Sequence, residues 1–236
     1  FFLFPLIYFY FCKKIEKKYL FPCYLVFVLI LIQGIVGWYM VKSGLVNNVS
    51  VSHYRLSLHL IIALTIISII FWLIINRFKK TFKRFFILNR NNLPFLILIF
   101  LIFSQIILGA FVSGLDAGKI YQTWPLMGHS FIPNDLEINN ISKFFQLDNH
   151  SLVQFYHRNM AYFLSIYIIL LTFFIYKKEQ KITYPILLIL FFLLTQIVLG
   201  IFTLTSGLNI YLASAHQITS VLLAFTTLNL YFFNIK

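Results

Sequence analysis

The sequence predicts an all-α protein that crosses a membrane several times. Of its 236 residues, 61% are hydrophobic and 11% are charged, and the mean hydropathy is +0.89. This composition lies far outside that of soluble globular domains. Uncharged apolar stretches long enough to cross a bilayer recur along the chain. Because backbone polar groups find no water in lipid, each stretch is expected to be a helix.

Six stretches are predicted to be complete spans. They are Leu20–Val41, Leu56–Ile75, Leu93–Leu115, Asn159–Tyr176, Ile182–Leu208 and Ile210–Asn234. The first apolar run, Phe1–Cys12, is too short for a bilayer that needs about 20 residues, so it is expected to be the tail of a further span. We therefore expect this sequence to be an N-terminally truncated fragment.

Lys and Arg are distributed unevenly between the two sides of these spans. Fourteen of the 19 basic residues fall on one side: Lys13, Lys14, Lys17, Lys18, Arg77, Lys79, Lys80, Lys83, Arg84, Arg90, Lys177, Lys178, Lys181 and Lys236. By the positive-inside rule, this side faces the cytoplasm or matrix, in a bacterial plasma membrane or a mitochondrial inner membrane. Because topology explains the net charge of +13, nucleic-acid binding is not expected.

The one long connection, Asp116–Ser151, is then predicted on the outer side. It either caps the helices against water or serves as an ordered connector. The two cysteines, Cys12 and Cys23, flank a Lys-rich turn on the inner side and support no disulfide framework.

Three helices are predicted to end on the outer side with related sequences. These are QGIVGWYMVKSGL (Gln33–Leu45), QIILGAFVSGL (Gln105–Leu115) and QIVLGIFTLTSGL (Gln196–Leu208). In the first and third, Gly follows Gln by four places and SGL begins ten places on. Such spacing predicts a pseudosymmetric bundle built from a parallel repeat. The alternative is that Gln and small residues simply pack helices together.

Three histidines are predicted at one depth in the membrane: His59, His157 and His216. They lie on every second span, so their helices run in the same direction, and each is near the outer end. Buried ionisable groups in spans are costly and often functional. A haem iron between helices needs two axial imidazoles at one height, and His157 and His216 meet that requirement. His59 would be half of an equivalent pair.

Each of these histidines has a simpler alternative, which is a hydrogen bond to a neighbouring helix. His53 competes with His59, but it is expected at the water boundary, and His129 and His150 are expected to be solvated in the long loop. Arg55 and Arg158, also at the outer boundary, either pair with the carboxylates of a cofactor or extend to lipid headgroups.

Several stretches of the chain closely resemble the haem A synthase family, in the branch shared by mitochondria and alphaproteobacteria. They are GWYMVKSGL (Gly37–Leu45), VSHYRLSLHL (Val51–Leu60), QIILGAFVSGLDAGKIYQTWPLMGHSFIPNDL (Gln105–Leu136), VQFYHRNMAY (Val153–Tyr162) and ASAHQ (Ala213–Gln217). The resemblance covers nearly the whole chain. It implies an eight-helix membrane oxidoreductase, made of two four-helix bundles, that oxidises a ring methyl of haem O to a formyl group. The product, haem A, serves cytochrome c oxidase assembly.

The resemblance also implies a domain organisation and a set of ligands. Residues 1–75 would be the remnant of a substrate-haem bundle, 76–92 a basic inner linker, and 93–236 a haem b bundle. His157 and His216 would bind haem b, and His59 would bind the substrate haem. The family's other ligand and a catalytic glutamate would precede Phe1, so no catalytic residue is assigned. Because Cys12 and Cys23 lie on the inner side, a thiol-based redox step is not expected.

The expected partners are haem O, the enzyme that supplies it, the lipid bilayer, an unidentified electron acceptor and a second copy of the chain in a homo-oligomer. Two other classes of protein share part of this pattern. A di-haem b electron-transfer protein would show the same histidines, but it would leave the ring substituents of haem unchanged. A secondary transporter would show repeats, but it would also show carboxylates or broken helices near the midplane.

Overall fold

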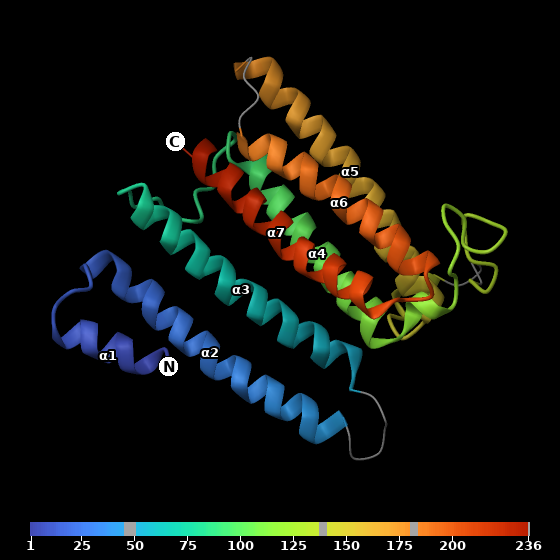
Figure 1. Cartoon of the computed structure of the whole chain (residues 1–236), viewed down its shortest axis with the longest axis horizontal. Coiled ribbons are helices and arrows are strands. Elements are labelled where there is room, and N and C mark those ends of the chain that lie inside the picture. The colour runs from blue at the N-terminus through green and yellow to red at the C-terminus, as the bar shows by residue number, and fades with distance from the viewer. Residues whose placement is uncertain (45–50, 137–140, 180–183, 236) are drawn as a thin grey trace. The chain divides into compact units, whose positions relative to one another are not determined.

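The computed structural model describes residues 1–44, 51–136, 141–179 and 184–235 (Figure 1). Its elements are α1 Leu3–Phe11, α2 Lys17–Gly44, α3 His53–Phe78, α4 Leu93–Gly114, η1 Ala117–Lys119, η2 Ile141–Phe145, α5 His150–Glu179, α6 Tyr184–Thr205 and α7 Ile210–Asn234. The predicted all-α class is confirmed. Leu45, Lys181, Ile182 and Lys236, which the predictions above include, lie outside the described residues.

Five helices, α2 to α6, are long and apolar enough to cross a bilayer, as expected of an integral membrane protein. They confirm five of the six predicted spans. The sixth, α7, runs over the predicted residues 210–234 but falls outside this group. Its sequence includes His216, Gln217 and Asn229, which lower its apolar character. Because α7 packs on both α6 and α4, it need not be apolar around its whole circumference.

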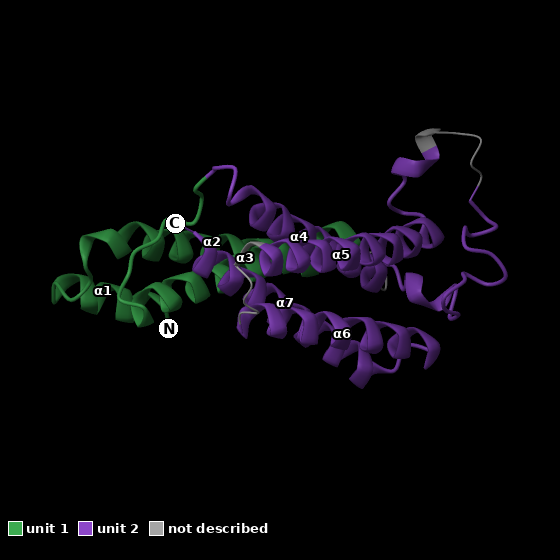
Figure 2. Cartoon of the chain, turned by 90° about the horizontal axis from the view of Figure 1, so that it is seen from above, with its two compact units in different colours: residues 1–87 green, residues 88–236 purple. Residues whose placement is uncertain are grey.

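The chain divides into two compact units, residues 1–87 and 88–236, shown in green and purple in Figure 2. The boundary falls inside the segment 76–92 that we expected to be a linker. Unit 1 contains α1 and the α2–α3 hairpin. Unit 2 contains α4 to α7, in which α4 packs on α5 and on α7, and α6 packs along α7.

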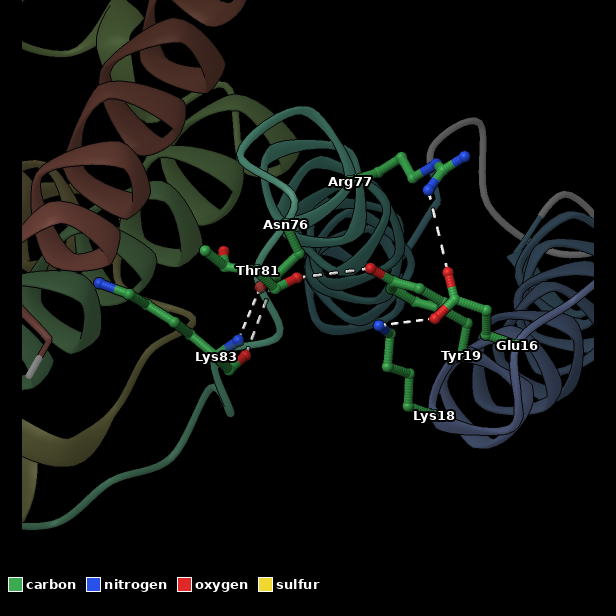
Figure 3. Close-up of polar contacts among 7 residues, drawn as sticks. All are labelled: Glu16, Lys18, Tyr19, Asn76, Arg77, Thr81 and Lys83. Carbon is green, nitrogen blue, oxygen red and sulfur yellow. Dashed lines mark hydrogen bonds and ion pairs between the residues drawn. The ribbon is translucent and has the colours of Figure 1, made fainter.

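In unit 1, a buried asparagine folds the chain back after α3. Asn76 is 0% exposed; its Oδ1 accepts the Lys83 N–H at 2.7 Å, and its Nδ2 donates to the Trp72 carbonyl at 3.0 Å. The Trp72 indole donates to the Lys83 carbonyl at 3.0 Å. Figure 3 shows this turn beside an ion-pair cluster in which Glu16 lies 2.6 Å from Lys18 and 3.8 Å from Arg77. This end of the hairpin is therefore ordered by polar contacts.

In unit 2, the α6–α7 turn shows what the repeated SGL triplet does. The N–H of Leu208 donates to the Thr203 carbonyl at 2.9 Å, and the N–H of Gly207 to the Leu204 carbonyl at 3.3 Å. This is a Schellman cap, and it needs the left-handed φ of 72° that Gly207 adopts. Asn209 then caps α7 by accepting from two backbone N–H groups. The turn therefore places α6 and α7 side by side.

The same triplet acts differently at the end of α4. There Gly114 is still helical, and the chain turns one residue past the triplet at Asp116, whose φ is 53°. The same three residues thus give two different helix ends. The triplet at the end of α4 is followed by the long loop, whereas the triplet after α6 is followed directly by another helix.

The α5 helix begins nine residues earlier than the predicted span Asn159–Tyr176. Asn149 explains the difference, since its Oδ1 accepts the Leu152 N–H at 3.0 Å, as an N-capping side chain does. The end of the predicted loop is therefore helical, and His157 lies about two turns inside α5, as predicted.

The described part of the loop between α4 and α5 is tied to α5 by polar contacts. The Gln154 amide donates to the Tyr121 carbonyl at 2.8 Å, and the Tyr156 hydroxyl donates to the Phe144 carbonyl at 2.6 Å. Met127 is 2% exposed and forms an isolated β-bridge with Ser130. These contacts favour the ordered connector of the two roles considered above.

Candidate functional site

The three predicted histidines occupy equivalent positions near the starts of their helices. His59 is the seventh residue of α3, His157 the eighth of α5 and His216 the seventh of α7. Each imidazole is therefore about 10 Å along its helix from the first residue. All three are half-buried.

Each imidazole packs against a glycine of the preceding helix. A Cβ atom added at Gly37, Gly109 or Gly200 would meet the Cε1 atom of His59, His157 or His216 at 2.9, 3.2 and 3.2 Å respectively. In every case the next nearest ring atom is Nδ1. The same edge of the ring thus faces glycine in all three hairpins.

A glutamine one turn before each glycine reaches the same histidine. The Gln105 Nε2 donates to the His157 carbonyl at 3.0 Å and lies 3.2 Å from the ring Nδ1. The Gln196 Nε2 donates to the His216 carbonyl at 2.7 Å. In the first hairpin, the Gln33 Nε2 instead lies 3.2 Å from the ring Nε2 of His59. Because an amide N–H can only donate, that ring nitrogen is the acceptor.

Two of these rings keep a nitrogen that nothing in the structure satisfies. The Nδ1 atoms of His59 and His216 are buried without a hydrogen-bond partner. In unit 2, His157 and His216 lie on α5 and α7, each about two turns from the start of its helix. The sequence predicts these two on opposing helices at one height, and their joint ligation of a haem stays a prediction.

Side-chain packing in the α6–α7 hairpin of unit 2 is tightest away from His216. The buried residues of α6 all precede Leu194, and those of α7 all follow Leu222. At the level of His216, the side chains of both helices remain half-buried or exposed. An imidazole in such surroundings can ligate a metal centre that supplies further packing surface of its own.

The other histidines differ from these three. His129 and His150 are exposed, which agrees with the expectation of solvated side chains. His53 is the first residue of α3, but its side chain is only 7% exposed and its ring lies 4.1 Å from that of Tyr54. His53 was expected at the water boundary. Its position at the start of α3 agrees with this, but its buried side chain does not. Gln33 and Gly37 contact His59, which distinguishes it from His53.

The two predicted arginines make different contacts. The Arg158 guanidinium donates to the carbonyls of Thr123, Tyr121 and Leu126 at 2.6, 3.3 and 3.2 Å, so it binds the long loop to α5. Arg55 donates to the Ser43 hydroxyl at 2.5 Å and lies 4.8 Å above the Tyr39 ring. Binding of cofactor carboxylates by either arginine stays a prediction.

The carboxylate of Asp135 stabilises the loop near Arg158 by accepting hydrogen bonds. Asp135 accepts from the Tyr121 hydroxyl at 2.8 Å and from the Ser151 hydroxyl at 2.5 Å. Partial burial raises the pKa of Asp135, but the hydrogen bonds from Ser151 and Tyr121 outweigh it and hold that pKa below its ordinary value. Partial burial and the neighbouring Asp135 raise the pKa of Tyr121.

Sequence reasoning identified the histidines but missed what holds them. The signal was available, because Gln and Gly recur four residues apart in three helices and each is followed by a helix with a histidine near its start. From the sequence, that spacing indicates a repeat or helix packing. Its link to the histidines is seen only in the contacts of each Gln and Gly with a histidine of the next helix.

Comparison with known proteins places this site in context. The family described as cytochrome oxidase assembly protein matches residues 1–228. A protein named heme A synthase from Pelagibacter ubique is 45% identical over 224 residues, which is 92% of this chain and 64% of the relative. Those from Rickettsia africae and Rickettsia bellii are 40% and 42% identical, over 93% of this chain and 66% of each relative. The chain thus spans just under two thirds of the length of these curated relatives.

Proposed function

Because the chain belongs to the cytochrome oxidase assembly protein family, we propose that it acts in haem A synthesis, as a haem A synthase. In this proposal it oxidises a ring methyl of haem O to a formyl group. The names of the similar proteins support the activity. The observation that carries it in this chain is that His157 on α5 and His216 on α7 occupy equivalent helix positions, each with its ring against a glycine.

The proposed cofactor is haem b, held by His157 and His216. Among the residues that the structure describes, no three His, Cys, Asp or Glu side chains gather as a metal site. A centre held by two imidazoles must therefore bring its other ligands with it, as a porphyrin does. The buried Nδ1 of His216, without a partner, and the half-buried side chains at its level fit such a group.

His59 is the proposed ligand of the substrate haem in unit 1. Its ring has the same edge against Gly37 as the unit 2 rings have against Gly109 and Gly200. In this reading, unit 1 is the substrate-haem part and unit 2 the haem b part of the protein. Arg55 and Arg158 lie four residues before His59 and one after His157, where cationic groups would bind haem carboxylates.

A bound haem supplies redox chemistry that side chains lack. The residues of this chain hold the imidazoles in place, and Arg158 binds the ordered loop to α5. Converting a methyl to a formyl group with an oxygen atom from water releases four electrons and four protons, so the reaction needs an electron acceptor. We propose that the unit 2 site relays those electrons, and that a haem O-producing membrane enzyme supplies the substrate.

The test is haem extraction and chromatography on protein expressed in cells that make haem O. Recovery of haem b together with haem O or haem A is expected. Haem b alone, with no haem A formed, would indicate a di-haem b electron-transfer protein. Protein without any haem would indicate that the histidines only hydrogen-bond neighbouring helices. A His157→Leu variant is expected to stop haem A formation, and unchanged conversion would contradict the relay role.

A further inference from the structure

We propose that three Gln–Gly pairs, Gln33 with Gly37, Gln105 with Gly109 and Gln196 with Gly200, are positioning residues for the three histidine ligands. The inference rests on the proposed haem ligation by His59, His157 and His216. It goes further in assigning a role to side chains that touch no haem: each pair sets the place of one imidazole before haem binds.

The glycines act by leaving space. In all three hairpins the ring occupies space that a Cβ atom would need. A Cβ added at the glycine would lie 2.9 Å from the imidazole Cε1 at Gly37 and 3.2 Å from it at Gly109 and Gly200, so the ring would have to move. The atom in contact belongs to the end of a rotatable side chain rather than to backbone. Alanine at these positions therefore displaces the imidazole and leaves the helix intact. By contrast, a Cβ at Gly34 would meet nothing within 4 Å.

The glutamines act by hydrogen bonding to the residue that carries the ring. Gln105 and Gln196 donate to the carbonyl of His157 and His216 themselves, at 3.0 and 2.7 Å. Gln196 also bonds the Thr219 hydroxyl on the same face of α7. Each bond joins the two helices of a hairpin at the level of the histidine, as interhelical hydrogen bonds from polar side chains do in membrane bundles. The amide oxygens of Gln33 and Gln105 are buried without a hydrogen-bond partner.

The same three-part arrangement recurs in hairpins with connections of very different length. Gln and His are 26 residues apart in α2–α3, 52 in α4–α5 and 20 in α6–α7. Local chain geometry therefore does not produce the contact. Metal ligands held by outer-shell partners have fixed orientation and tuned affinity, and loss of such a partner typically costs about 10-fold to 100-fold in metal affinity.

The first experiment compares Gly109→Ala and Gly200→Ala with the control Gly34→Ala in the complete protein. Haem b content, the visible spectrum of the reduced protein and the midpoint potential are measured, with helix content by circular dichroism. Both unit 2 variants are expected to hold haem b about 10-fold or more weakly and to shift its potential at unchanged helix content. Gly34→Ala is expected to match wild type.

A second pair of variants tests the glutamines without adding volume between the glycine and the histidine ring. Gln105→Met and Gln196→Met remove the amide, and Ser104→Ala and Thr195→Val are their controls, because each control residue bonds only a carbonyl one turn back in its own helix. The methionine variants are expected to shift the potential and the controls are not. If alanine at a glycine position lowers the yield of folded protein, these variants carry the same test.

In unit 1, Gly37→Ala is expected to affect only the haem held by His59, with Gly34→Ala as the control on the same helix. Failure of the proposed function and failure of the positioning role give different results. Wild-type protein without haem would overturn the proposed function. Wild-type protein with haem, together with glycine and glutamine variants that match their controls in affinity and potential, would overturn the positioning role alone.

Discussion

The α2–α3 hairpin of unit 1 and the two hairpins of unit 2 hold their histidines differently. Gln33 contacts His59 at the ring Nε2, whereas Gln105 and Gln196 donate to the backbone carbonyls of His157 and His216. Gln105 also lies 3.2 Å from Nδ1 and 3.5 Å from Nε2 of the His157 ring. The carbonyl bonds of unit 2 do not involve ring nitrogens, so they can persist when a ring binds a ligand. The contact between Gln33 and His59 is therefore expected to be more sensitive to ligation of the ring than the contacts in unit 2.

The largest expected effect tests that contrast directly. His157→Leu and His216→Leu should each remove nearly all haem b, because one axial imidazole remains, while His59→Leu should leave haem b in place. Pyridine haemochrome spectra of the purified variants measure the content. Equal loss of haem b in all three variants would mean that the units do not bind haem separately.

The next effect distinguishes the units by stability. Asn76→Leu should destabilise unit 1 by about 1–3 kcal/mol, because it leaves the Lys83 N–H without its partner. Limited proteolysis after Phe78 and thermal unfolding measure the change. Asn234→Leu in unit 2 is the control, since that amide donates to the Leu230 carbonyl of its own helix. A similar loss of stability in both variants would contradict a specific role of Asn76 in ordering the turn after α3.

A smaller effect compares the two arginines. Arg158→Gln should raise hydrogen exchange in residues 121–126 by about tenfold, because charge-assisted bonds to three carbonyls are lost. Arg55→Gln should leave that loop unchanged, since its bond is to Ser43. Exchange measured by mass spectrometry checks both. Faster exchange of the loop in both variants would show that neither contact is specific.

The smallest effect is a pH dependence confined to the loop of unit 2. Since the pKa of Asp135 is lowered on folding, the contribution of its ionised form is present above the ordinary Asp pKa and is lost as the pH falls below about 4. Trp124 fluorescence during acid titration follows the loop. Ser151→Ala, which removes a stabilising hydrogen bond, should move the change to higher pH; a shift to lower pH would contradict this account.

Much of the fold could be predicted because span length and charge distribution are one-dimensional properties. The start of α5 could not, since Asn149 capping is a local detail that the apolar pattern does not report. The reduced apolar character of α7 was also missed, because uncharged polar residues do not interrupt a charge-free stretch.

The histidines of the candidate site could be predicted from the sequence, whereas the residues that contact them could not. His157 and His216 are recognisable because imidazole is rare and costly within a span. The role of Gln105 depends on a contact 52 residues away, which no sequence window contains. Arg158 illustrates the same limit: its place at a boundary suggested charged partners, and the structure gives it loop carbonyls.

The Schellman turn between α6 and α7 also bears on the order in which the protein folds. It keeps Gln196 and His216 within 20 residues, whereas Gln105 and His157 are 52 apart. Closing the longer segment costs about 0.8 kcal/mol more in chain entropy, before the internal bonds of the loop reduce it. We expect the His216 contact to form soon after α7 is inserted, so that the α6–α7 pair provides a finished surface on which the slower α4–α5 pair completes its packing.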